Sequence, residues 1–194
     1  MKTEKRKKIA FVGTHGSGKT TMALDLVSRL KRKNIVADIM PEVARGSPYL
    51  LCDGPSSEAQ LHLFGAQIEC ELRYIRGRGL LILDRSLLDI VMYTELFFPN
   101  SVYNKMMQTF VKGYMATYDI IFRTTIVYNS EKTEDNLRPR SNELQMQAHA
   151  KLGSMLDEYY PGYINLPDVN DPVAFMFDHI INSSTGGQTL EIPK

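Results

Sequence analysis

Short apolar runs alternate along the chain with longer segments whose apolar residues recur every three or four positions. Apolar runs bounded by Gly, Pro or charged residues predict buried strands, whereas the three-to-four spacing predicts helices with one buried face. The predicted strands cover residues 9–12, 36–40, 80–83, 120–122 and 163–166. The predicted helices include residues 23–30, 57–76, 86–97, 101–117, 142–160 and a last helix that begins at 171–172. This alternation indicates an α/β fold, a parallel sheet with helices on both faces.

Charged residues follow three of the predicted strands directly. The segment 42–45 follows the second strand, Asp84-Arg85 the third, and Arg123 the fourth. Ligands of parallel sheets bind beyond the carboxyl ends of the strands. We therefore expect these three charged groups to converge at one edge of the sheet.

The first predicted strand leads into Gly13-x-x-x-x-Gly18-Lys19-Thr20, the spacing of a phosphate-binding loop. Glycines let such a loop curl so that its N–H groups point at phosphate oxygens, while the Lys reaches the β- and γ-phosphates. The following helix adds the positive end of its dipole. The sequence thus predicts a nucleoside-triphosphate enzyme that uses ATP. The residues of this loop that would bind the nucleotide are Gly13, Thr14, His15, Gly16, Ser17, Gly18, Lys19, Thr20 and Thr21. For His15, the role of a solvent-facing spacer is a simpler interpretation than a catalytic role.

Asp84 ends a wholly apolar strand, which is the arrangement of a metal-binding acid in enzymes with a phosphate loop. We expect its carboxylate and the Thr20 hydroxyl to hold Mg²⁺. The alternative is that Asp84 only caps the next helix.

Arg85 and Glu42 are the candidate groups for the second substrate. A guanidinium beside the metal can clamp an acceptor or spread the charge of a transferring phosphoryl group. Glu42, at the end of the second strand, can accept the proton of an acceptor hydroxyl. A salt bridge between Arg85 and Glu42 is the simpler structural role, and both roles are compatible.

The helix predicted over 57–76 carries two neighbouring stripes at helical spacing. One is apolar and is expected to face the core; its members are Leu61, Ile68, Leu72 and Ile75. The other is mixed; its members are Gln60, Phe64, Gln67, Glu71 and Tyr74. The mixed stripe is either the edge of a surface helix or a wall that stacks a planar ring and binds its edge.

The polar segment 129–142 precedes a helix and contains Arg138 and Arg140. Charged loops are usually solvated. Here a lid that supplies arginines to the transferring phosphoryl group is the favoured interpretation.

Length and composition indicate the number of domains and the kind of partner and compartment that suit this chain. The 194 residues suit one domain over 1–194, with loose tails at 1–7 and 183–194. A net charge of +1, with 43% hydrophobic and 23% charged residues, does not favour a nucleic-acid-binding surface. No apolar run has membrane-spanning length, and two cysteines without metal-binding spacing suit a reducing cytoplasm.

These motifs resemble those of small kinases with a phosphate loop. Pro41-Glu42-Val43-Ala44-Arg45 and Asp84-Arg85-Ser86 are similar to motifs of the deoxyribonucleoside kinases, in which the Glu is the general base. Phe64 and Gln67 lie on the helix that contacts the base in those enzymes. With Asp135-x-x-Arg138, the pattern over residues 8–166 looks closer still to the ATP-binding kinases that contain a nicotinamide riboside kinase domain, and thymidylate kinases belong to the same group. This resemblance implies the strand order 2-3-1-4-5.

The combined expectation is an ATP- and Mg²⁺-dependent kinase that phosphorylates a hydroxyl of a nucleoside-like small molecule. Its acceptor would contact Glu42, Arg45, Phe64, Gln67 and Arg85. Three alternatives stay open: a nucleoside monophosphate kinase, in which Arg45 and Arg85 bind the acceptor phosphate, a kinase of DNA or polynucleotide ends, and a non-kinase ATPase. The sequence also leaves open whether the chain forms a homodimer.

Overall fold

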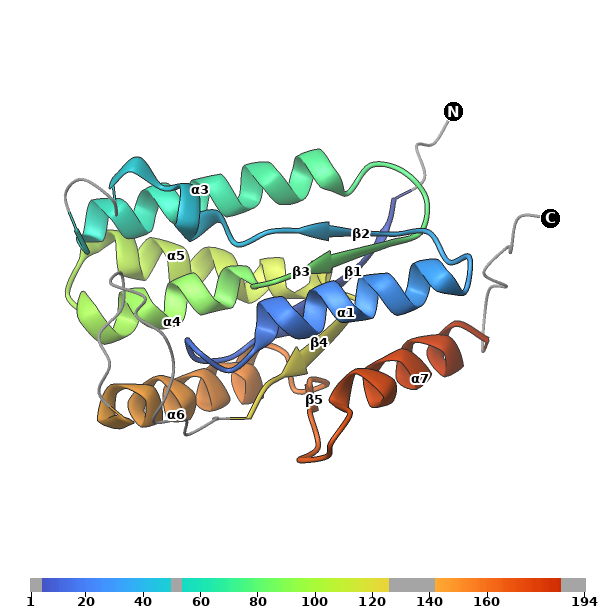
Figure 1. The fold of residues 1–194 in the computed structure, drawn as a ribbon. Helices are drawn as coiled ribbons and strands as arrows, with labels where there is room; N and C mark the ends of the chain where they lie inside the picture. Colours follow the sequence, from blue (N-terminus) through green and yellow to red (C-terminus); the bar gives the residue numbers. More distant parts are fainter. Residues whose placement is uncertain (1–4, 50–53, 126–141, 186–194) are drawn as a thin grey trace.

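The computed structural model describes residues 5–49, 54–125 and 142–185, and within them a single parallel sheet forms the centre of the molecule (Figure 1). Its strands are β1 (Lys7–Val12), β2 (Ala37–Met40), β3 (Leu80–Leu83), β4 (Ile120–Arg123) and β5 (Ile164–Asn165). The order β2-β3-β1-β4-β5 confirms the predicted topology. In the central strand, Ile9 pairs with Ile82 on one side and with Ile120 on the other.

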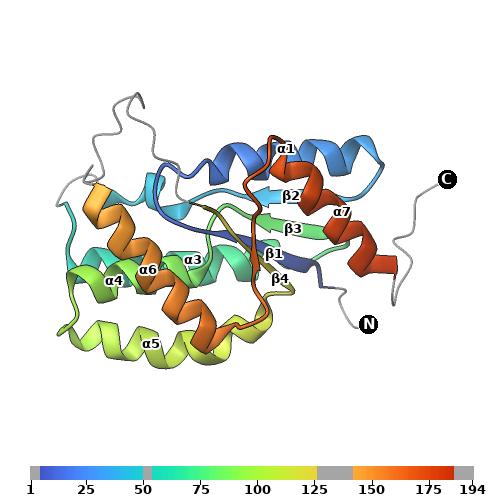
Figure 2. The ribbon, with the colours of Figure 1, turned by 90° about the horizontal axis from the view of Figure 1, so that it is seen from below.

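Helices cover both faces of the sheet, as Figure 2 shows. One face is covered by α1 (Lys19–Arg32) and α7 (Pro172–Thr185). The other is covered by α3 (Ser57–Tyr74), α4 (Leu87–Phe97), α5 (Val102–Tyr114) and α6 (Asn142–Tyr159). Two 3-10 turns complete the described chain, η1 (Val43–Gly46) and η2 (Met115–Thr117).

The central strand shows why most strand positions are apolar. Successive side chains of a strand point to opposite faces. Ile9 and Phe11 pack into the layer of α1 and α7, whereas Ala10 and Val12 pack into the layer of α3 to α6. Both faces are buried, so the positions from Ile9 to Val12 favour apolar residues. Lys8 of the same strand is the exception, since its buried ammonium pairs with Glu71.

Serine side chains cap the start of α3, α4 and α5. Ser56 accepts a hydrogen bond from the N–H of Ala59 at the start of α3, and Ser86 and Ser101 cap α4 and α5 in the same way. Regular structure begins inside the predicted loose tail 1–7, since Lys5 forms a β-bridge with Arg76 and β1 begins at Lys7. Among the described residues, no helix is long and apolar enough to cross a bilayer.

The orientation of α3 differs from the prediction. Leu72, assigned to the core-facing stripe, is 60% exposed, whereas Gln67 and Glu71 of the mixed stripe are each 1% exposed. Leu61, Ile68 and Ile75 are only partly buried. Periodicity treats polar residues as solvent-facing, but here the buried side of α3 carries polar groups that are hydrogen-bonded inside the protein.

Candidate active site

The connection between β1 and α1 forms a tight turn at the carboxyl end of the central strand. Gly18 immediately precedes α1 with φ +78°, and Gly13 has φ +154°. A Cβ at Gly13 would lie 1.9 Å from Thr124 Oγ1, so only glycine fits there. The first turn of α1 contains no acidic residue, which leaves its N–H groups and dipole available to an anion.

Lys19 folds over this turn and is 5% exposed. Its ammonium donates to the carbonyl oxygens of Gly13 at 2.9 Å and Thr14 at 2.5 Å, and to Ser17 Oγ at 3.1 Å. Burial, aided by the positive charge of Arg85, lowers the pKa of Lys19 to about 7, although nearby carboxylates oppose the shift. The cation therefore lies where a phosphate group could replace the carbonyl oxygens as its partner.

The rest of the loop is held by neighbouring elements. Ser17 Oγ donates to the Thr14 carbonyl at 2.9 Å and lies 2.8 Å from Thr124 Oγ1, just beyond β4. Thr124 in turn donates from its backbone N–H to the carbonyl of Val12 at 2.9 Å. These contacts fix the loop to two strands at once, while Thr21 faces outward on α1.

His15 is more than an outward-facing spacer. Its backbone N–H lies 3.3 Å from Tyr93 Oη and its Nδ1 lies 3.1 Å from the same oxygen. Gln145, at the start of α6, donates its amide to the His15 carbonyl at 2.8 Å. Two helices from the same layer thus contact the phosphate loop at His15.

Thr20 and Asp84 meet as the metal prediction requires. The Thr20 hydroxyl donates to Asp84 Oδ2 at 2.7 Å, and Asp84 is 3% exposed. Mg²⁺ keeps several waters and uses one or two protein oxygens together with substrate phosphates, and this pair fits that preference. No larger cluster of acidic, His or Cys ligands exists within the described ranges.

Glu42 and Arg85 form an ion pair across the carboxyl ends of β2 and β3. Arg85 Nε lies 2.6 Å from Glu42 Oε1, and both side chains are at least nine-tenths buried. The contact is electrostatic, since Nε is not aligned for a hydrogen bond. Burial alone would lower the pKa of Arg85, but the carboxylates of Glu42 and Asp89 outweigh burial and raise it. Arg85 thus stays cationic at every physiological pH.

Asp89 is a site residue that the sequence analysis missed. It is fully buried, accepts a hydrogen bond from Gly13 N–H at 3.1 Å, and lies 4.0 Å from Arg85 Nη1. It also completes a capping box with Ser86 at the start of α4. The pattern Ser86-x-x-Asp89 is itself a capping signal and could have indicated this residue.

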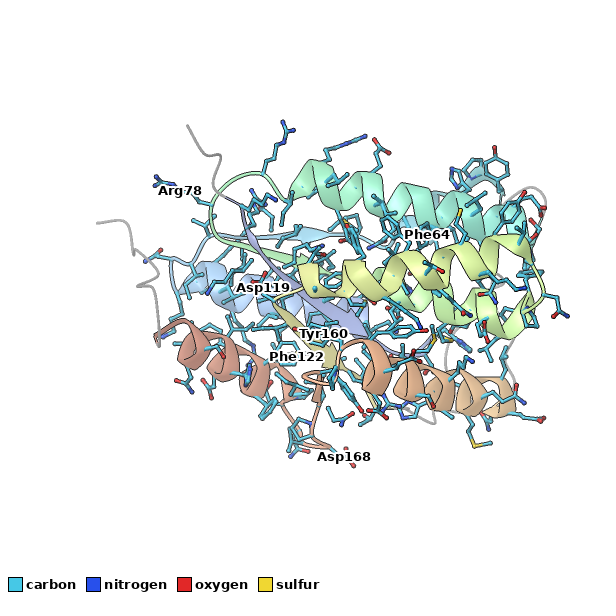
Figure 3. The ribbon with its side chains drawn as sticks, turned by 180° about the vertical axis from the view of Figure 1, so that it is seen from behind. Phe64, Arg78, Asp119, Phe122, Tyr160 and Asp168 are labelled. Carbon is cyan, nitrogen blue, oxygen red and sulfur yellow. The ribbon has the colours of Figure 1, made fainter. Side chains whose placement is uncertain are left out.

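One member of the mixed stripe of α3, Gln67, contacts the backbone of this region. Phe64 is 5% exposed and packs edge-to-face on Phe110 of α5, with ring centroids 5.5 Å apart (Figure 3). Gln67 donates its amide nitrogen to Glu71 Oε1 at 2.9 Å and to the Arg85 carbonyl at 3.2 Å. Helix α3 thus contacts Phe110 through Phe64 and the backbone of Arg85 through Gln67.

Comparison with known proteins shows the family of the chain. Residues 8–171 match the family AAA_28, described as an AAA domain. The chain belongs to this family. No curated protein matches the sequence significantly.

Solved structures share the fold of this AAA domain at low sequence identity. The NadR protein, solved in complex with NR, is 17% identical with a TM-score of 0.72; the match covers 97% of this chain but 54% of the NadR chain, so this chain spans about half of NadR. Thymidylate kinase from Candida albicans is 17% identical with a TM-score of 0.67, covering 93% of each chain. Deoxyadenosine kinase from M. mycoides is 17% identical with a TM-score of 0.61, covering 92% of this chain and 98% of the kinase.

Of the predicted arginines Arg45, Arg123, Arg138 and Arg140, the structure describes the side chain of Arg123 alone. Arg138 and Arg140 lie outside the described residues, and Arg45 lies in η1 with a side chain that is also outside the description. Arg123 does not join the Glu42 and Asp84 groups, because its guanidinium donates to the His149 carbonyl at 2.8 Å on α6. The carboxyl ends of β2 and β3 therefore supply the convergent charges, and β4 does not.

Proposed function

We propose that this AAA domain is a kinase that transfers the γ-phosphoryl group of ATP to a hydroxyl of a nucleoside-like small molecule. The observation that carries the proposal is the Glu42–Arg85 pair, which lies on the strand ends beside the Thr20–Asp84 pair. A switch or motor ATPase needs a residue that positions water, whereas a kinase needs a proton acceptor and a cation facing a second substrate.

The donor nucleotide would bind at the phosphate loop. N–H groups of the loop and the first turn of α1 would contact its phosphates, and Lys19 would exchange its carbonyl partners for phosphate oxygens. Thr20 and Asp84 would hold Mg²⁺, which withdraws charge from the transferring group when bound. Arg138 and Arg140 would approach the same phosphates from the segment before α6.

Glu42 would take the proton of the acceptor hydroxyl. As that oxygen bonds to the γ-phosphorus, the bond from phosphorus to the bridging β-phosphate oxygen breaks, and ADP leaves with its electron pair. Arg85 lies within reach of both the base and the added charge, so it would orient the acceptor and stabilise the transferred group. This assigns chemistry to two side chains that are otherwise costly to bury.

The acceptor would lie between the charged pair and the aromatic pair Phe64–Phe110. An apolar aromatic wall with a few fixed polar groups suits a planar ring carrying a sugar. Kinases with the same fold include a deoxyadenosine kinase and a thymidylate kinase, which supports an acceptor of this class. Free nucleosides and ATP are intracellular metabolites, so we place the protein in the cytoplasm.

The test is phosphate transfer from γ-labelled ATP to a panel of nucleosides, nucleoside monophosphates and oligonucleotides, with Glu42→Gln as the control. We expect labelled product from a free nucleoside with the native chain and very little with the variant. Transfer only to monophosphates would replace the proposal by a monophosphate kinase. Preference for an oligonucleotide would indicate a polynucleotide kinase, and release of phosphate to water alone would indicate an ATPase.

A further inference from the structure

A buried polar cluster lies behind the candidate active site, centred on Glu71. Its members come from three different parts of the chain: Lys8 from β1, Gln67 and Glu71 from α3, and Tyr114 and Tyr118 from the end of α5 and the turn after it. Lys8 Nζ lies 2.7 Å from Glu71 Oε2. We call these five residues the Glu71 cluster.

Stability alone does not account for this cluster. Glu71 is 1% exposed and Lys8 4%. Removing two charges from water costs several kcal/mol per ion, and apolar residues of similar volume often serve a core equally well. Here every acceptor lone pair is used: Glu71 accepts from Lys8, Gln67, Tyr114 at 3.0 Å and Tyr118 at 2.7 Å. Such complete pairing fixes the positions of the groups bound to the carboxylate.

Two members of the cluster reach the backbone of the active site. Gln67 donates to the Arg85 carbonyl at 3.2 Å, and the Tyr118 hydroxyl accepts from Leu87 N–H at 2.9 Å. Leu87 is the first residue of α4, so its N–H has no partner within the helix. The two contacts therefore hold the chain on both sides of Ser86.

We propose that Glu71 is a positioning residue, which acts through Gln67 and Tyr118 to fix the backbone that carries Arg85. The carboxylate holds both side chains, and they hold the turn between β3 and α4 from which the Arg85 guanidinium extends toward Glu42. The inference gives Gln67 a role through the backbone rather than through the acceptor. It rests on the proposed function only in that Arg85 orients the acceptor.

The cluster contains its own matched control. Tyr114 and Tyr118 each donate a hydroxyl to Glu71, but Tyr118 alone of the two also accepts a hydrogen bond from the active-site backbone at Leu87. Tyr114→Phe and Tyr118→Phe make the same chemical change at the same carboxylate. If Glu71 had a merely structural role, both variants should affect kcat/KM for the acceptor similarly.

The kinetic test compares the two variants where urea denaturation shows both to be folded. A misplacement of about 1 Å can cost up to about 100-fold in rate. We expect Tyr118→Phe to lower kcat/KM for the acceptor by about tenfold or more, with the KM for ATP unchanged, and Tyr114→Phe to change neither. Gln67→Met, which removes the other backbone contact, should resemble Tyr118→Phe. Equal kinetics for the two Tyr variants would overturn the proposal.

A second measurement does not depend on activity. Hydrogen exchange of the Leu87 amide should be faster in Tyr118→Phe than in the native chain, and unchanged in Tyr114→Phe, because only Tyr118 binds that N–H. If native protein phosphorylates no acceptor, the proposed function fails, yet this exchange still decides whether the cluster holds the turn. Identical Leu87 exchange in both variants would reject the positioning role even in an active kinase.

Discussion

The carboxylate of Asp89 joins the phosphate loop to the start of α4. Its Oδ1 accepts the N–H of Gly13 at 3.1 Å, and its Oδ2 accepts the N–H and the hydroxyl of Ser86, each at 2.9 Å. Both oxygens are thus occupied by groups from opposite sides of the site. One buried side chain thus links the phosphate loop to the residues that follow Arg85.

Asp89→Asn should break either the contact of this side chain with Gly13 or its contacts with Ser86. An amide has one acceptor oxygen, and its NH₂ would face an N–H donor, so one of the two contacts must be lost. We expect a loss of stability of about 1–3 kcal/mol, together with weaker nucleotide binding, measured by urea denaturation and calorimetric titration. Ser86→Ala is the control, because it removes the helix cap but leaves the contact from Gly13 to Asp89. Unchanged nucleotide affinity in Asp89→Asn would contradict the role of Asp89 at the loop.

Gly13→Ala should abolish nucleotide binding through a single collision. The added Cβ would lie 1.9 Å from Thr124 Oγ1 and 3.2 Å from Thr124 Cβ. Thr124→Ala in the same chain should therefore restore binding in part, since it removes the nearer atom but not the strained φ. Thr124→Ser keeps Oγ and should restore nothing. Equal binding by the two double variants would show that the collision is not the cause.

Glu42→Gln tests the proton acceptor. The variant keeps the size of the side chain but loses the basic oxygen, so kcat should fall by about 10²–10⁴-fold. ATP affinity should change little, because Glu42 lies after β2, at the start of η1, and is not among the contacts of Lys19. The measurement is steady-state kinetics with the acceptor found in the transfer assay. A variant that instead loses ATP binding would make Glu42 part of the metal or nucleotide site.

The depressed pKa of Lys19 predicts a pH dependence of stability. The side chain loses its proton above about pH 7 in the folded protein, whereas in the unfolded chain it keeps the proton to about pH 10.5. The unfolded state thus binds more protons between these values, so stability should rise with pH, by up to about 1.4 kcal/mol per pH unit. Denaturation of nucleotide-free protein between pH 7 and 9 measures the rise. Lys19→Met should lack this contribution, and identical slopes for variant and native chain would exclude it.

The fold and part of the site follow from local patterns in the sequence. The phosphate loop is contiguous, and Asp84 ends an apolar run, so their meeting at Thr20 follows once both strands are placed in one parallel sheet. The resemblance to small kinases supplied the strand order, which no local pattern contains.

The sequence-based predictions for α3 and Arg123 are wrong because tertiary contacts override the local sequence pattern. The buried side of α3 is polar because Glu71 pairs with Lys8, a residue distant in sequence that lies next to the predicted tail 1–7. Arg123 follows a strand as Asp84 does, but the backbone of α6 offers its guanidinium a nearer acceptor. Neither partner can be inferred from the residues adjacent in sequence.

The central place of β1 has a consequence for the synthesis of the protein. Ile9 emerges first, but its two neighbours in the sheet are Ile82 and Ile120. The first strand therefore has no neighbour in the sheet until the ribosome has made β3, and contacts between such distant residues form slowly. An apolar segment that waits in this way is prone to aggregate and is a natural target for chaperones.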